Sequence, residues 1–287
     1  MKKYVSLILF TLILVFSVFA GGCTSESELP VQKNSQDPMS GISVISYEKT
    51  PVSYLDLSYN VSLAYREFGT ENTEPLLMIM GFGQTMDQWD TTFIGILSKN
   101  YHVYMYDHRG MGKSTDIEAQ YSLSQLSDDA ANLITGLGYD SMNIYGVSMG
   151  SSVSQNLLID HPEKVKKAIL SSASYSASIP ATEKLHSQLT ESAQNPYTPE
   201  GVKKEAVANL NWGGCYDNLS EIKNDVMLIT GTADDLTPQS VAVEIAGQID
   251  GSWLVRFKGI PHAGSFYAPV EYGEITTTFL EMNEAPA

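Results

Sequence analysis

The chain has 287 residues, of which 43% are hydrophobic, so it is long enough to bury a large core in one domain or two small ones. Its 33 acidic residues outnumber its 17 basic residues, which gives a net charge of −16 at pH 7. Recognition of nucleic acid or of anionic lipid by a folded domain depends on basic patches, so this balance argues against both classes of partner.

The N-terminus has the features of an export signal. Lys2 and Lys3 precede an uncharged apolar run from Tyr4 to Ala20, and small residues follow before Cys23. We therefore predict a signal peptide over residues 1–22 and an exported protein. The run is near the minimum length that spans a bilayer, so an uncleaved N-terminal transmembrane anchor is an alternative, as is a secreted protein.

Residues 19–23, Phe-Ala-Gly-Gly-Cys, resemble the lipobox of prokaryotic lipoproteins, although Ala20 stands where these sequences usually carry Leu. The resemblance implies lipidation of Cys23 and anchoring at the outer face of the cell membrane. The polar sequence that follows has little to bury, so residues 23–41 are predicted to form a flexible tether. With Cys23 lipidated, Cys215 has no disulfide partner and is expected to be a small buried residue.

From Val52 onward the chain alternates between strand and helix patterns. Two segments with alternating polarity, Val52–Leu57 and Val61–Phe68, predict a hairpin. Largely apolar runs typical of strands buried on both faces follow at Leu76–Met80, Val103–Tyr106, Met142–Tyr145, Val165–Leu170 and Val226–Thr230, with a further strand at Trp253–Phe257. Helical patterns lie at Trp89–Ser98, Leu123–Leu137, Ser151–Asp160, Pro238–Ile249 and Pro269–Met282, and Ser122 has the position of an N-terminal cap. This alternation predicts an α/β fold with a mostly parallel central sheet over residues 42–172 and 213–287.

The alternation stops between residues 173 and 212. Leu185 and Leu189, and then Val202, Ala206 and Leu210, have the spacing of short helices in an otherwise polar stretch. The stretch is too long for a structureless loop in a compact domain. We therefore predict a small helical lid over residues 173–212, inserted after a strand of the sheet.

Residues 146–150, Gly-Val-Ser-Met-Gly, join a predicted strand to a predicted helix. A sharp strand-to-helix turn of this G-x-S-x-G form holds a serine hydroxyl clear of the backbone, and its glycines let the chain pass close to itself. Ser148 is therefore the candidate nucleophile. The alternative is a Gly-rich turn without a chemical role.

Five motifs in this order resemble those of the α/β-hydrolase superfamily, in particular its small, lid-bearing serine esterases and lactonases. They are Met80-Gly81-Phe82-Gly83, Asp107-His108-Arg109-Gly110-Met111-Gly112-Lys113-Ser114, the Ser148 turn, Gly231-Thr232-Ala233-Asp234-Asp235-Leu236-Thr237-Pro238 and Gly259-Ile260-Pro261-His262. The resemblance covers Val52 to Phe279. It implies the α/β-hydrolase fold, with helices on both faces of the sheet and a small helical lid.

The resemblance also implies the groups that would act with the serine. A serine hydroxyl is a weak nucleophile at neutral pH, so it requires a base and a group that orients the base. The G-x-x-D-x-x-x-P spacing assigns the acid to Asp234 rather than to Asp235, and the last loop assigns the base to His262. His108 is interpreted as a structural or supporting residue.

The implied oxyanion donors are the backbone N–H groups of Phe82 and Met149, although Met80 stands in the place of the usual histidine. Several apolar side chains near the motifs are predicted to line a substrate pocket, with a plain core position as the alternative for each: Phe82, Met86, Trp89, Met149, Phe266 and Tyr267. The sequence has no His and Cys cluster at ligand spacing, so neither a metal nor a cofactor is expected.

These observations predict a serine hydrolase that cleaves a small, apolar carboxylic ester or lactone through a Ser-His-Asp acyl-enzyme. Carbon–carbon bond hydrolases, perhydrolases of the haloperoxidase type and aminopeptidases of the same fold remain alternatives. A non-catalytic binding protein with this fold is the alternative of a different class. The oligomeric state is left open.

Overall fold

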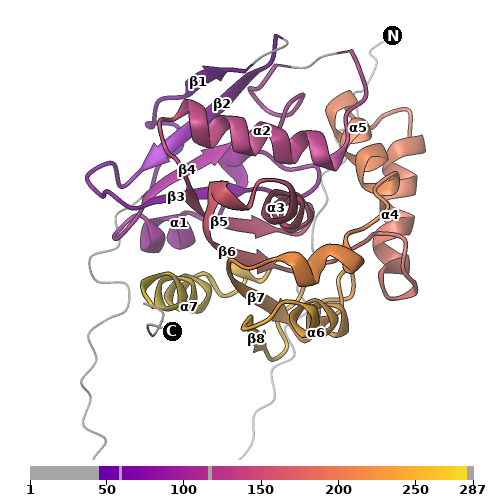
Figure 1. Ribbon diagram of the computed structural model, residues 1–287. Helices are drawn as coiled ribbons and strands as arrows, with labels where there is room; N and C mark the ends of the chain where they lie inside the picture. Colours follow the sequence, from indigo (N-terminus) through magenta and orange to yellow (C-terminus); the bar gives the residue numbers. More distant parts are fainter. Residues whose placement is uncertain (1–44, 58–59, 116–117, 283–287) are drawn as a thin grey trace, which may run out of the picture. The chain divides into compact units, whose positions relative to one another are not determined.

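The computed structural model describes residues 45–57, 60–115 and 118–282 (Figure 1). The predicted signal peptide, the lipidation site Cys23 and the predicted tether lie outside these residues. Within the described ranges, none of the helices has both the length and the apolar character that crossing a bilayer requires.

The core contains one eight-stranded sheet with the strand order β1-β2-β4-β3-β5-β6-β7-β8. The strands are β1 (Ser53–Asp56), β2 (Ser62–Phe68), β3 (Pro75–Ile79), β4 (His102–Tyr106), β5 (Met142–Val147), β6 (Val165–Ser171), β7 (Asp225–Gly231) and β8 (Trp253–Phe257). The β1–β2 and β2–β4 pairs are antiparallel, and all other pairs are parallel. The predicted hairpin and the mostly parallel sheet are both confirmed.

Helices cover both faces of this sheet (Figure 1). One face packs against α1 (Thr91–Leu97) and α7 (Pro269–Glu281), and the other against α2 (Leu123–Gly136), α3 (Met149–Asp160) and α6 (Gln239–Gln248). Strands β3 and β5 are buried along their whole length because helices lie on both sides of them. This explains why both strands are apolar throughout except for Asn143 of β5.

Two caps account for where helices begin. The Ser122 hydroxyl accepts a hydrogen bond from the Gln125 N–H at 3.1 Å, so α2 begins after Ser122 as predicted. The Asp90 carboxylate accepts from the N–H groups of Thr92 and Phe93, each at 2.9 Å. Helix α1 therefore begins at Thr91, two residues later than its apolar pattern indicated.

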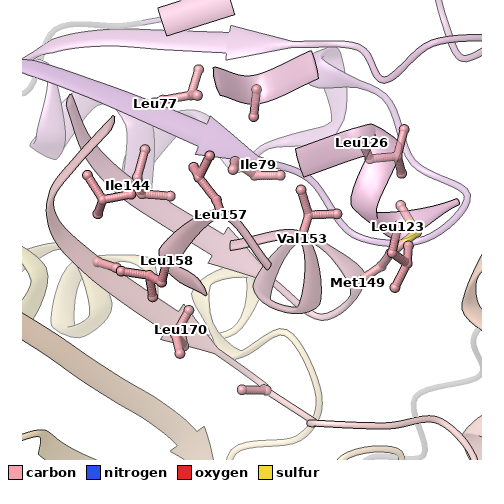
Figure 2. Packing of buried hydrophobic residues seen from close by; sticks show 14 of the residues in the cluster. Leu77, Ile79, Leu123, Leu126, Ile144, Met149, Val153, Leu157, Leu158 and Leu170 are labelled. Atoms are coloured by element: carbon pink, nitrogen blue, oxygen red, sulfur yellow. The ribbon is translucent and has the colours of Figure 1, made fainter. Parts of the chain in front are cut away.

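Helix α3 connects the Ser148 turn to the core. Figure 2 shows Met149, Val153 and Leu157 on the side of α3 that packs against the neighbouring strands and α2, with Leu123 next to Met149. All four side chains are at most 3% exposed. Because these residues recur every three or four positions, one continuous apolar stripe fixes the helix that follows the candidate nucleophile.

Residues 173–212, which we call the helical insertion, leave the sheet after β6. They contain the short 3₁₀ turn η3 (Pro180–Thr182) and the helices α4 (Glu183–Gln194) and α5 (Glu200–Leu210) (Figure 1). A separate small cluster of Ala177, Leu189 and Ala206 joins these helices and contacts Phe82 of the core. Helices are thus present where the spacing predicted them, and the role of a lid stays a prediction.

Candidate active site

Ser148 lies at the turn between β5 and α3 and has an unusual backbone conformation. Its φ of 55° and ψ of −120° fall in a region that residues with a side chain rarely adopt. The turn is held by hydrogen bonds on both sides, since the Ser148 N–H donates to the Ser171 carbonyl at 2.9 Å and the Ser148 carbonyl accepts from the Ser151 N–H at 2.9 Å. Strain of this kind occurs where the surrounding structure fixes a functional side chain.

The glycines at the turn are required by close backbone contacts. A Cβ at Gly150 would meet the backbone carbonyls of Ile79 and Met80 at the end of β3. A Cβ at Gly81 would lie 3.2 Å from the Ser148 Cβ and 3.3 Å from the Val147 carbonyl oxygen. The loop after β3 therefore packs directly against the serine turn, and glycine is the residue that permits this approach.

The structure brings Ser148, His262 and Asp234 together. The Ser148 Oγ lies 2.9 Å from His262 Nε2, and His262 Nδ1 lies 2.9 Å and 3.0 Å from the two carboxylate oxygens of Asp234. Ser148 follows β5, Asp234 follows β7, and His262 follows β8, so three strand ends at one edge of the sheet carry the three side chains. This geometry matches a nucleophile, a base and an orienting acid.

The Asp234 carboxyl is fully buried, while the His262 side chain is 19% exposed. Burial would raise the pKa of Asp234, but the hydrogen bond and charge of His262, together with the N–H and hydroxyl of Thr237, bring this pKa below its ordinary value. Asp234 is therefore ionised at neutral pH and accepts from a protonated Nδ1. The lone pair of His262 Nε2 then faces the serine hydroxyl.

Two residues that the sequence motifs did not single out support this series. The Thr237 hydroxyl lies 2.9 Å from an Asp234 carboxylate oxygen and 3.0 Å from the Ser172 carbonyl. The Ser172 hydroxyl in turn accepts from the Ala263 N–H at 3.0 Å. Ser172, at the end of β6, thereby links the loops that carry Asp234 and His262.

Asp235 pairs with a residue of the helical insertion and not with His262. Its side chain is 68% exposed and forms an ion pair with Lys184 of α4. The spacing argument that favoured Asp234 as the partner of the histidine agrees with this geometry.

Residues of the motif at 107–114 hold the loops around the site. The buried Asp107 carboxylate accepts from the Met86 and Lys113 N–H groups, each at 2.7 Å. His108 Nε2 lies 3.2 Å from the Met80 carbonyl, and burial lowers the pKa of His108 to about 4. A neutral His108 therefore supports the backbone directly after β3.

The Phe82 and Met149 residues line a cavity beside Ser148. In the described part of the chain, no hydrogen bond occupies the backbone N–H of either residue. Two free donors on either side of a serine can stabilise the negative charge that develops on a carbonyl oxygen during acyl transfer.

The cavity beside Ser148 has a volume of only about 10 Å³, close to the space of one water molecule. Its apolar lining comes from both the core and the helical insertion: Phe82, Met149, Ala177, Leu185, Leu189 and Trp212. The insertion thus supplies most of the wall that faces the hydroxyl.

The predicted pocket residues Met86, Trp89, Phe266 and Tyr267 do not line this cavity. Met86 and Trp89 lie in and directly after the 3₁₀ turn η1 (Met86–Gln88), are at most 2% exposed, and pack in the core on the α1 and α7 face of the sheet. Phe266 packs against the same core, and Tyr267 is 61% exposed. This correction leaves Phe82 and Met149 as the predicted residues that do line it.

Among the described residues, no group of three or more His, Cys, Asp or Glu side chains is arranged to hold a metal ion. Cys215 is buried and donates to the Gln155 side-chain oxygen at 3.4 Å, and burial raises its pKa to about 12. Its predicted role as a small buried residue is confirmed.

Comparison with known proteins identifies the architecture. Residues 74–192 match a family model described as alpha/beta hydrolase fold. The chain is 25% identical over 258 residues to an (E)-2-((N-methylformamido)methylene)succinate hydrolase of Acinetobacter baylyi. The matched region covers 79% of this chain and 97% of that protein.

Two solved structures have the same arrangement. A hydrolase from Pseudomonas aeruginosa superposes with a TM-score of 0.71 at 22% identity, over 80% of this chain and 98% of its own. The enol-lactonase from Burkholderia xenovorans superposes with a TM-score of 0.69 at 20% identity, over 80% of this chain and 100% of its own.

Proposed function

We propose that this chain, which has the α/β-hydrolase fold, is a serine hydrolase that cleaves a carboxylic ester or lactone through an acyl-enzyme. The observation that carries the proposal is the hydrogen-bonded series from Ser148 through His262 to Asp234. The similarity to proteins named as a hydrolase and an enol-lactonase supports the same class of reaction.

In the proposed acylation step, Ser148 Oγ attacks the substrate carbonyl while His262 Nε2 takes the hydroxyl proton. The ionised Asp234 stabilises the imidazolium and holds its orientation. The N–H groups of Phe82 and Met149 donate to the oxyanion of the tetrahedral intermediate, and His262 then protonates the leaving alkoxide. In deacylation, water takes the place of the alcohol and the same groups act in reverse order.

The lining of the Ser148 cavity favours an uncharged, apolar group next to the scissile bond. Among the described residues that line the cavity, six have apolar side chains and none has a charged one, so a charged substrate group there would lose its hydration without an ion-pair partner. The cavity of about 10 Å³ is too small for an acyl group, so we propose that α4 and α5 act as a lid that moves when substrate enters. Trp212 also borders an open groove of about 920 Å³ beside α5, which is the proposed entrance.

A fluorophosphonate probe and a panel of 4-nitrophenyl esters test this function on the full-length protein in detergent. We expect a probe adduct on Ser148 and hydrolysis of short uncharged esters, with both lost in Ser148→Ala. Best turnover of charged esters would contradict the proposed selectivity. A folded wild-type protein without a Ser148 adduct would instead favour a non-catalytic binding protein.

We also propose that the protein is exported and held at the outer face of the cell membrane by a lipid on Cys23. The positively charged start, the apolar run and the sequence before Cys23 support this location. We expect Cys23→Ala to release the protein from the membrane fraction. If the variant still fractionates with membranes, lipidation is not the anchor, and an uncleaved N-terminal helix becomes the better explanation.

A further inference from the structure

Glu205, on helix α5 of the helical insertion, has a fully buried carboxyl group that the catalytic scheme above does not use. Its Oε2 accepts a hydrogen bond from the backbone N–H of Gly83 at 2.7 Å. Its Oε1 has no hydrogen-bond partner among the described residues, and no ion pair to Glu205 occurs among them. Burial of an unpaired carboxyl is unfavourable, so its place beside this loop requires an explanation.

The N–H that Glu205 binds belongs to the loop that carries the proposed oxyanion donor. Gly83 directly follows Phe82, and its φ of 73° lies in the left-handed region. The loop has few other internal restraints, since the Gln84 N–H donates to the Gly81 carbonyl at a long 3.4 Å. The acceptor on α5 therefore fixes the peptide next to the Phe82 N–H.

Burial, together with the smaller effect of the nearby Asp107 charge, raises the pKa of Glu205 to about 8, although the hydrogen bond from the Gly83 N–H lowers it in part. The carboxyl is thus largely neutral at pH 7. A neutral acid still accepts through its carbonyl oxygen, and it places no full negative charge near the position where an oxyanion would form.

We propose that Glu205 is a positioning residue for the oxyanion hole, which it orients by accepting the Gly83 N–H from the helical insertion. The proposal rests on the serine hydrolase function above. It has a mechanistic consequence: the insertion that covers Ser148 also aligns a donor of the catalytic centre. Movement of α5 away from the core would break this hydrogen bond, so the oxyanion hole is complete only when α5 is in place.

The matched variants Glu205→Gln and Glu205→Met test the acceptor. Both remove the ionisable group and keep the length of the side chain, but only Gln retains an oxygen that accepts from Gly83. With 4-nitrophenyl acetate as the substrate, we expect the kcat of Glu205→Gln to lie within about threefold of the wild-type value. The kcat of Glu205→Met should be lower by about 10- to 100-fold, because a misaligned N–H donor stabilises the oxyanion less well. The KM of both variants should change by less than about threefold, since the contact acts on the transition state.

Lys203→Ala, a partly exposed position on the same helix, serves as the control for general effects on α5. Hydrogen exchange at the Gly83 amide of the wild-type protein gives a second measurement that needs no variant, and slow exchange is expected. Equal kcat values for the Gln and Met variants in an active enzyme, or fast exchange at the Gly83 amide, would overturn the positioning role of Glu205 and leave the proposed hydrolase function intact. Absence of Ser148-dependent hydrolysis in the wild-type protein would overturn the proposed function and this proposal with it.

Discussion

The sheet core and the helical insertion contribute to the site in different ways. The core carries Ser148, Asp234 and His262 on the ends of hydrogen-bonded parallel strands, whose positions are fixed by many backbone bonds. The insertion reaches the same site through a few side chains, including Glu205 at Gly83 and Lys184 at Asp235. We infer that the core sets the chemistry and that the insertion controls access and the alignment of one donor.

The largest expected effects concern the core. Asp234→Asn should lower kcat by about 10⁴-fold, because the amide would favour the wrong His262 tautomer. Asp235→Asn is the matched control, since the adjacent carboxylate is exposed and faces Lys184. The rate of ester hydrolysis at saturating substrate gives kcat for both variants. A comparable loss in the two variants would remove the distinction between the buried site and its solvated neighbour.

The next largest effect is expected on stability, at the close backbone contact between the serine turn and the end of β3. Gly150→Ala places a methyl group against the carbonyls of Ile79 and Met80, which we expect to lower the free energy of unfolding by about 3 kcal/mol. Gly247→Ala, at an exposed position of α6 with nothing within 4 Å of the added Cβ, should instead raise it by about 0.5 to 1 kcal/mol. Urea unfolding of both variants checks this contrast, and a stable Gly150→Ala protein would show that β3 can move away.

The stability of the protein should depend on pH through Glu205 of the helical insertion. Its pKa is raised to about 8 in the folded protein, compared with an ordinary value of 4.5, so the folded state holds a proton that the unfolded state releases between these values. The contribution of the group to stability is therefore fully present below about pH 4.5 and is lost as the pH rises through about 8. Asp107, directly after β4, is the charged group that raises the pKa of Glu205. Burial, and to a smaller extent the charges of Asp129 and Glu205, raise the pKa of Tyr106 at the end of β4 well above its ordinary value, so Tyr106 is neutral there.

We expect the melting temperature of Glu205→Gln to fall less than that of wild type between pH 6 and pH 9. Thermal unfolding at a series of pH values gives the comparison, with Glu200→Gln at the exposed start of α5 as the control. Parallel curves for wild type and Glu205→Gln would mean that this carboxyl is not buried as an acid.

The smallest effect is expected for the ion pair between Lys184 and Asp235. Both side chains are more than half exposed, so solvent screens their attraction, and Lys184→Ala should change the free energy of unfolding by less than about 0.5 kcal/mol. Thermal unfolding and the KM for 4-nitrophenyl esters test whether the pair also holds α4 over the site. An increase in stability would indicate that the pair opposes the packing of the insertion.

The sequence predicted the parts of the molecule that follow from periodicity and local motifs. The largely apolar strands, the Ser122 cap and the G-x-S-x-G turn each have a local physical cause, and the structure places them accordingly. The resemblance of the motifs to those of the α/β-hydrolase superfamily also predicted which Asp and His would meet Ser148 in space. Their catalytic roles stay predictions.

Most of the pocket could not be predicted in the same way, because apart from Phe82 and Met149 its apolar walls come from segments without a motif. Met86 and Trp89 are close to Phe82 in sequence, yet a 3₁₀ turn takes them to the other face of the sheet. Leu185 and Leu189 belong to the insertion and reach Ser148 only through tertiary packing. Glu205 gave no signal at all, because a glutamate in a polar helical stretch is normally solvated.

The left-handed backbone at Ser148 has a consequence for engineering this protein. Strain of this kind costs about 1 to 3 kcal/mol, and glycine would adopt the same conformation without it. A selection for heat resistance alone would therefore enrich Ser148→Gly, a folded and more stable protein without the candidate nucleophile. Directed evolution of the enzyme must score turnover together with thermal survival, because at this position the two objectives oppose each other.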